Sequence, residues 1–521
     1  MVKTPPDIRR RLFSSFNAQT LAILLRVIQQ IVLIPALITG WGAGVTQDWI
    51  LITTAAGLFA MCDFGAQAHF SNSLVIDWAR GDQAGYRRTF SVAMAIYGGI
   101  MALSAAGLLG LSFLAPLENM LGTKLLSESG VKWAFDLMAL ATICVLPIGV
   151  VGAIYRAHGD YFHGVVPVIA AEAARGFGVC LMAFLQADPA TAAALNLAIA
   201  LLLWAYMLVD VRRRFGPVPF TPIRPQRGEL MRAAWQSGLY FIPSAATPLV
   251  LTIPVLMLGH LSETGTAVLS YTVYRTLTGF VRQFVNQMCH PVGAEMARQQ
   301  AMNDRVKLRK LFLAGGRLAS GVAGVMGGVT LVLASPFLRI WTHGAVPDDP
   351  LLLIVFLATV ILLAPAQVAM VLFLYNNRPL TLVLGNGGYA AGTALFCALM
   401  IQGYSAAGAA AGTGLAEFLF IGLLVTAVAA RDAAVGAARY LVLSSATAAT
   451  GFGLSFGAAW TLQHFLHAQS LSSLFLVGML WAGLVMLPAY FIVLHAEERR
   501  WVRAQAGQIG RRVLAASGLL S

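Results

Sequence analysis

The chain has little charge for its length and lacks the motifs of a soluble enzyme. Only 11% of its 521 residues are Asp, Glu, Lys or Arg, whereas a soluble domain carries about 25%. The five cysteines fall singly in apolar stretches, which argues against disulfides and against a zinc site. Walker A, Rossmann, HExxH and nucleophile-elbow patterns are all missing. We therefore predict no cofactor, no metal and no catalytic residue, and we do not expect an enzyme.

Long apolar stretches occupy most of the chain instead. Hydrophobic residues make up 58% of it, and its mean hydropathy is +0.75. About 20 apolar residues cross the hydrocarbon core of a bilayer, and about 14 stretches reach that length. They lie near residues 18–39, 49–75, 90–114, 133–156, 163–186, 190–210, 238–259, 264–289, 313–336, 350–375, 380–401, 406–430, 440–463 and 471–494. The sequence predicts an all-α polytopic membrane protein with about 14 transmembrane helices.

The basic residues indicate how these helices are oriented. Of the 35 Lys and Arg residues, 27 fall in every second connection or in the two tails, and the alternate connections hold only Lys124, Lys132 and Arg339. Short basic loops stay on the cytoplasmic side, so we expect both termini in the cytoplasm of a bacterial cell with the chain in the inner membrane. The same loops account for the net charge of +13, which favours anionic membrane lipids over nucleic acid as partners.

Polar connections divide the chain. The longest one is basic and proline-rich, and we interpret residues 211–237 as a cytoplasmic linker. It separates an N-lobe of six helices (1–210) from a C-lobe of six (238–430), followed by two helices (440–494) and a basic cytoplasmic tail (495–521). Similar basic segments recur about 218 residues apart. A six-helix repeat keeps its orientation in the membrane, which predicts two lobes around a central cavity.

Several polar and ionisable residues lie deep in the apolar stretches, where a charge is costly unless it faces a partner or a wet cavity. We predict that three arginines bind an anionic group, because a guanidinium suits phosphate: Arg26, Arg275 and Arg282. The other candidates for lining the cavity or coupling to an ion are Asp63, Glu172, Arg175, Asn286 and Glu417. Alternatively, Glu172 and Arg175 pair with each other across one helical turn, and Asp63 neutralises an arginine.

Two segments carry a resemblance to a known family. A basic tail leads directly into the first apolar stretch (Arg9–Leu37), and the second stretch, Trp49–Asn72, contains the sequence DFG at Asp63–Gly65. With the predicted topology, the chain resembles a Wzx-type polysaccharide flippase of the multidrug/oligosaccharidyl-lipid/polysaccharide (MOP) exporter superfamily.

The resemblance implies a V-shaped, two-lobed transporter that alternates between inward- and outward-facing states. Its substrate would be an undecaprenyl-diphosphate-linked oligosaccharide, moved to the periplasmic leaflet for lipopolysaccharide or exopolysaccharide biosynthesis, with polysaccharide polymerase and export machinery as candidate partners. Related lipid II flippases use arginines on helices 1, 2 and 8; Arg26 matches the first, and Arg275 or Arg282 the third. The second helix has Asp63 instead, which favours a repeat-unit flippase.

Two other classes of function stay open. A cation-coupled multidrug or metabolite antiporter of the same superfamily would use carboxylates, and Asp63 and Glu417 are available. A polymerase or ligase of lipid-linked sugars would need a substantial outside loop with catalytic charges, and the outside loops are short. Because the chain has no nucleotide-binding motif, transport energy is expected from an ion gradient, the membrane potential or the gradient of the substrate.

Overall fold

A computed structural model describes residues 8–216, 228–231, 241–262, 265–375 and 379–493. Within these ranges all regular structure is helical and no strand occurs, so the all-α prediction is confirmed. Most of the predicted linker 211–237 and the whole predicted tail 495–521 lie outside the described residues.

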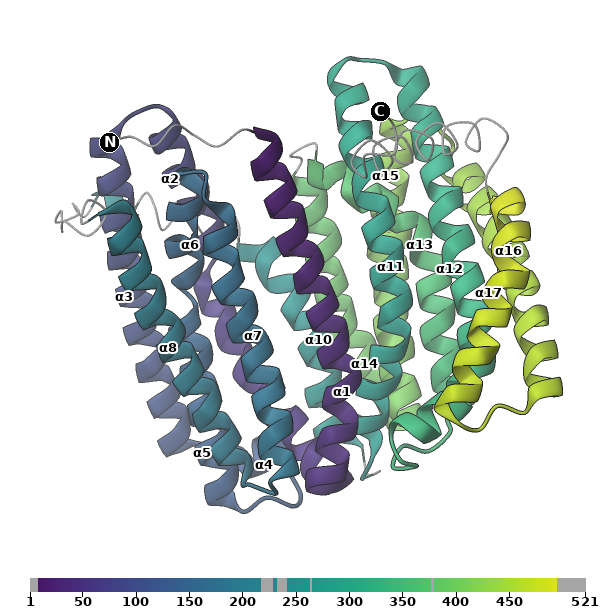
Figure 1. The fold of residues 1–521 in the computed structure, drawn as a ribbon, viewed down its shortest axis with the longest axis horizontal. Helices are drawn as coiled ribbons and strands as arrows, with labels where there is room; N and C mark the ends of the chain where they lie inside the picture. Colours follow the sequence, from purple (N-terminus) through teal and green to yellow (C-terminus); the bar gives the residue numbers. More distant parts are fainter. Residues whose placement is uncertain (1–7, 217–227, 232–240, 263–264, 376–378, 494–521) are drawn as a thin grey trace, which may run out of the picture. The chain divides into compact units, whose positions relative to one another are not determined.

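The chain forms two compact units (Figure 1). Unit 1 comprises residues 1–270 with 401–406, and unit 2 comprises 271–400 with 407–521. The helices up to the division are α1 (Ile8–Gly57), η1 (Leu58–Asp63), α2 (Ala66–Ala79), α3 (Gln83–Leu114), α4 (Leu117–Leu121), α5 (Glu128–Val145), α6 (Ile148–Ala157), α7 (Tyr161–Phe184), α8 (Pro189–Phe215) and α10 (Phe241–Leu261). Those that follow are α11 (Ala267–Ala301), α12 (Arg305–Trp341), α13 (Pro350–Tyr375), α14 (Pro379–Glu417), η3 (Phe418–Val425), α15 (Thr426–Asp432), α16 (Ala437–Leu466) and α17 (Leu471–Val493). The predicted lobe boundaries stay a prediction.

Each predicted membrane stretch coincides with a helical segment. Ten segments of the described chain are long and apolar enough to cross a membrane. Two of them, 28–63 and 380–432, each overlap two predicted stretches, which are separated by a kink: Gly42 (φ 80°) interrupts α1, and Ser405 (φ 47°) interrupts α14. The two remaining predicted stretches are α10 and α11. About 14 membrane crossings therefore fit the structure.

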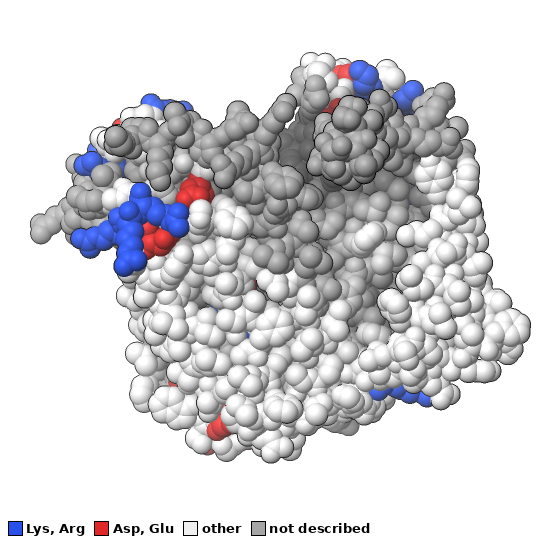
Figure 2. Space-filling model, viewed as in Figure 1, with Lys and Arg blue, Asp and Glu red and all other residues white. Residues whose placement is uncertain are grey.

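The flanks of the helices carry the surface that a bilayer would cover. On α3, Leu103 is 72% exposed and Leu109 is 59% exposed. In the view of Figure 2, charged side chains of the described residues gather near the upper and lower edges, while the surface between them carries almost none. Basic residues also fill the last turn of α8: Arg212, Arg213 and Arg214. Large exposed apolar areas are unfavourable in water, and hydrocarbon chains remove that cost.

In unit 2, α12 and α16 pack with their backbones in close approach. A Cβ atom added at Gly324 would lie 2.2 Å from the carbonyl oxygen of Ala448, and one at Gly328 would lie 2.7 Å from that of Phe452. Small residues let membrane helices approach this closely. The start of α12 is fixed by Asp304, whose side chain accepts a hydrogen bond from the backbone N–H of Lys307 (3.0 Å). This bond holds the pKa of the partly exposed Asp304 carboxyl below its usual value.

We predict that Gly324→Val forces α12 and α16 apart, because the nearest atoms are backbone atoms of Ala448 that cannot move aside. Overpacking of this kind costs about 1–3 kcal/mol, so the melting temperature of the purified protein should fall by several degrees. The matched control is Gly453→Val on α16, where a Cβ meets nothing within 4 Å. Equal melting temperatures for the two variants would contradict the close packing.

Candidate functional site

The helix that carries the DFG sequence is broken at that point. The 3-10 helix η1 ends at Asp63, and Phe64 (φ 47°) and Gly65 (φ 76°) adopt the left-handed conformation before α2 begins. Glycine adopts this conformation without strain, whereas a phenylalanine does so at a cost of about 1–2 kcal/mol. Asp63 then caps α2, because its Oδ2 accepts a hydrogen bond from the backbone N–H of Gln67 (3.2 Å). Its Oδ1 accepts a second hydrogen bond from the hydroxyl of Tyr97 on α3.

The fourth predicted membrane crossing is broken as well. Helix α5 ends at Val145, and α6 begins at Ile148 after Pro147. Proline has no N–H to donate and cannot continue the hydrogen-bond ladder of α5. Helices α2 and α6 then lie side by side, and the hydroxyl of Ser71 donates to the carbonyl oxygen of Gly149 (3.3 Å). A Cβ at Gly149 would collide with the side chain of Gln67 at 2.2 Å, so this glycine permits the approach.

The two helix breaks meet at a cavity of about 670 Å³ in unit 1, here called cavity A. Its lining includes the break residues Asp63, Phe64, Gly65, Val145 and Leu146, together with Gln67, Ser71, Asn72, Thr142, Arg156 and Arg175. Irregular backbone is tolerated at membrane depth where it is covered by protein or lines a water-filled space. A water-filled cavity therefore explains both the helix breaks and the polar lining, because water can bond the backbone groups that the breaks leave free.

A second cavity of about 510 Å³, cavity B, lies in the same unit. Helices α1, α5, α7 and α8 supply its lining, which includes Arg26, Gln29, Trp49, Thr53, Glu172, Arg175, Gly176 and Asn196. Arg175 lines both cavities. Hydroxyl, amide, indole and guanidinium groups thus surround two adjacent spaces that meet at one arginine.

Four of the predicted site residues come together at these cavities: Arg26, Asp63, Glu172 and Arg175. Glu172 pairs with Arg26 across helices, with 3.3 Å between Oε2 and Nη2, and their side chains are 47% and 60% exposed. The alternative pairing of Glu172 with Arg175 is therefore not the one that forms. Arg175 interacts with Glu172 electrostatically, without a hydrogen bond between them. Asp63 is held by Tyr97 and by α2, and no ion pair joins it to an arginine among the described residues.

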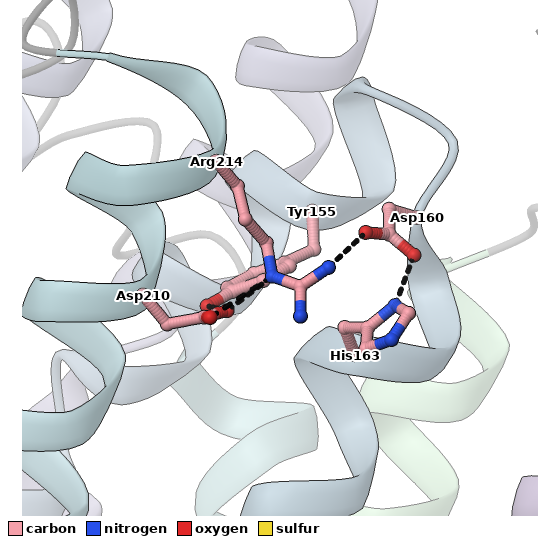
Figure 3. A network of polar contacts seen from close by, with 5 residues as sticks. All are labelled: Tyr155, Asp160, His163, Asp210 and Arg214. Carbon is pink, nitrogen blue, oxygen red and sulfur yellow. Dashed lines mark hydrogen bonds and ion pairs between the residues drawn. The ribbon is translucent and has the colours of Figure 1, made fainter.

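A polar network fixes the far end of α6 (Figure 3). The hydroxyl of Tyr155 donates to Oδ2 of Asp210 (2.8 Å), and Arg214 donates from Nε to the same carboxylate (2.8 Å). Arg214 also reaches Asp160 (3.4 Å), which contacts Nδ1 of His163 at 2.6 Å. The network joins α6 to α7 and α8 and thereby holds in place the helix that carries Arg156 at the wall of cavity A.

In unit 2 the predicted anion-binding residue Arg282 has a carboxylate partner. Its Nη1 and Nη2 atoms lie 2.6 Å and 2.9 Å from the two oxygens of Glu417. The hydroxyl of Tyr389 donates a third hydrogen bond to Glu417 (3.2 Å). The Glu417 side chain is 4% exposed and that of Arg282 is 33% exposed. A forked pair of this kind neutralises both charges.

The remaining two candidates lie on the same helix, α11. The guanidinium of Arg275 lies over the ring of buried Tyr271, 5.4 Å from its centroid. The Oδ1 atom of Asn286 is buried, and no hydrogen-bond partner for it occurs among the described residues. Arg275, Arg282 and Asn286 thus belong to unit 2, whereas the lining of cavities A and B belongs to unit 1.

Sequence analysis missed the neutral side chains of the site. Tyr97, Trp49 and Asn196 carry no charge, so a search for ionisable residues does not select them. The helix break could have revealed Tyr97, because Gly65 marks a point at which a neighbouring polar side chain is needed. No comparable signal marks Trp49 and Asn196, which line cavity B.

Comparison with known proteins identifies the fold. No family model and no curated protein matches the chain. Among solved structures, a lipid II flippase, MurJ, in an inward-closed conformation superposes with a TM-score of 0.70, covering 92% of this chain and 98% of that one at 10% identity. An inward-facing multidrug resistance MATE family transporter of the MOP superfamily has a TM-score of 0.62, covering 82% and 95% at 12% identity.

The chain therefore has the fold of MOP-superfamily transporters, as the resemblance implied. That fold is shared by a flippase and by a multidrug transporter, so it does not decide the substrate. The finer assignment to the Wzx type stays a prediction.

The Arg282–Glu417 pair gives a test of stability. Arg282→Gln removes the charged partner of the buried Glu417 carboxylate and leaves it the hydrogen bond from Tyr389, and breaking a buried pair costs about 3–5 kcal/mol. We expect a large fall in melting temperature. The double variant Arg282→Gln, Glu417→Gln removes both charges and should recover most of the loss. If the double variant were as unstable as the single one, the pair would not be the stabilising element.

Proposed function

We propose that the protein is a flippase for lipid-linked oligosaccharides, which moves an undecaprenyl-diphosphate-linked repeat unit from the cytoplasmic to the periplasmic leaflet by alternating access. The observation that carries the proposal is the chemistry of cavities A and B. Hydroxyl, amide and indole groups suit the sugars, and the arginines suit a diphosphate. The prenyl chain can stay in the bilayer while the polar head crosses.

The charges at the cavities favour an anion. Arg26, Arg156 and Arg175 line them, against the carboxylates Asp63 and Glu172. Each carboxylate already accepts a hydrogen bond or ion pair. The excess of cationic groups supports binding of a phosphate-containing head group rather than a cationic drug.

The same proposal includes location and partners. The asymmetry of the basic residues supports a multi-pass protein of the bacterial inner membrane with both termini in the cytoplasm. The repeat units would then serve surface or exopolysaccharide biosynthesis, with the polymerase and export machinery acting on them after transfer.

A second candidate function is cation-coupled antiport of a drug or metabolite. Asp63 favours it, because this carboxylate lies at a helix break on the wall of cavity A, where a proton or sodium ion could bind. The fold also superposes on a multidrug transporter. Direct assay separates the two functions.

We predict that the purified protein in liposomes exchanges a fluorescent undecaprenyl-diphosphate oligosaccharide between leaflets, measured with an impermeant quencher. Exchange should clearly exceed that of protein-free liposomes. Ala60→Trp fills cavity A and should slow it strongly, because Ala60 lines this cavity. The matched control Ala106→Trp places the same ring on an exposed position of α3 outside both cavities and should exchange normally.

Absence of exchange in the unsubstituted protein, together with proton- or sodium-driven uptake of a cationic dye, would replace the flippase with the antiporter. Equal exchange by the Ala60→Trp and Ala106→Trp variants would place the transport path outside cavity A.

A further inference from the structure

Arg175 differs from the other deep arginines because it lines both cavities and lies near the middle of its helix. It is 14 residues after Tyr161, the first residue of α7, or about 20 Å along the helix axis. It lines cavity A and cavity B together. Within the described part of the chain, its guanidinium forms no hydrogen bond and no ion pair. Its interaction with Glu172 is electrostatic and acts without direct contact.

The other arginines predicted to bind the anion are already occupied. Arg282 is forked onto the buried carboxylate of Glu417. Arg275 lies over the ring of Tyr271. Arg26 lines cavity B but is paired with Glu172. At Arg282 and Arg26 a new anion would have to displace a carboxylate, whereas at Arg175 it would not.

Glu172 lies between the two arginines of cavity B. It is on α7, one turn before Arg175, and its carboxylate reaches across to Arg26 on α1 at 3.3 Å. Both members of this pair are about half exposed, so the pair is weak and can be exchanged. Its negative charge also repels any anion at Arg175.

We infer that Arg175 is the residue that binds the diphosphate of the lipid carrier, and that Glu172 restrains this binding until the diphosphate takes its place as partner of Arg26. The inference rests on the proposed function. It gives the binding of substrate a defined order: the anion first contacts the unoccupied guanidinium and then breaks the half-exposed Arg26–Glu172 pair.

The test is binding of three probes with the same prenyl chain, farnesyl diphosphate, farnesyl monophosphate and farnesol, to the purified full-length protein at fixed ionic strength. Arg175→Gln should weaken farnesyl diphosphate binding on the order of tenfold to a hundredfold and leave farnesol unchanged. Arg175→Lys keeps the charge but loses the fork, so its affinity should fall between the two. The affinity difference between diphosphate and monophosphate should shrink in Arg175→Gln.

Glu172→Gln gives a prediction of opposite sign. It removes the competing carboxylate while keeping both arginines, so farnesyl diphosphate should bind about threefold to tenfold more tightly. A residue that served only the fold would not tighten binding when altered. The matched control is the charge-neutral double variant Arg339→Gln, Asp348→Asn, which removes a partly exposed ion pair outside the lining of both cavities, and its affinity should stay within about twofold of the unsubstituted protein.

The outcomes separate the inference from the proposed function. If the unsubstituted protein neither binds farnesyl diphosphate nor exchanges the lipid-linked oligosaccharide, the inference about Arg175 and the proposed flippase function are both overturned. If it does both, and Arg175→Gln binds and exchanges normally, only the inference is overturned. Unchanged or weaker binding by Glu172→Gln would also overturn it, even if Arg175→Gln failed to fold.

Discussion

The structure depends on one constraint: a backbone N–H or C=O in a bilayer has no water to bond, so the chain must satisfy it internally. Nearly every described segment does so by remaining helical. Two exceptions inside unit 1 are the breaks after Asp63 and before Ile148, and both open onto cavity A. The polar lining, the capping carboxylate and the arginine at the junction of the cavities all follow from placing irregular backbone where water can reach it.

The fold was largely predictable from the sequence, and the pairing of its charges was not. Hydropathy and the alternation of basic loops report on each segment separately, so they located stretches that correspond to helices even where Gly42 and Ser405 join two of them. The same patterns identified Glu172 and Arg175 as deep charges. They could not select partners, because Arg26 and Glu172 are 146 residues apart, and Arg282 and Glu417 are 135 apart. The i, i+3 rule for helices therefore favoured Glu172–Arg175, the pair that is nearer in sequence.

The two cross-helix ion pairs differ in burial and in geometry, which indicates a structural role for one and a role at the cavities for the other. The Arg282–Glu417 pair is forked, and its carboxylate is almost fully buried, so loss of one member leaves a buried charge. The Arg26–Glu172 pair has a single contact, is half exposed and lines a cavity. The first can stabilise unit 2 permanently, whereas the second can open and close with little change in energy.

The close packing of α12 and α16 has a mechanical consequence. The two backbones are in contact at Gly324 and Gly328. One helix therefore cannot slide along the other without first separating, and the two should move as one rigid body. If the protein transports as proposed, any displacement of α12 would then move α16 with it. The lateral pressure and thickness of the bilayer would affect the rate of that displacement, so the rate of transport should differ between membranes of different composition.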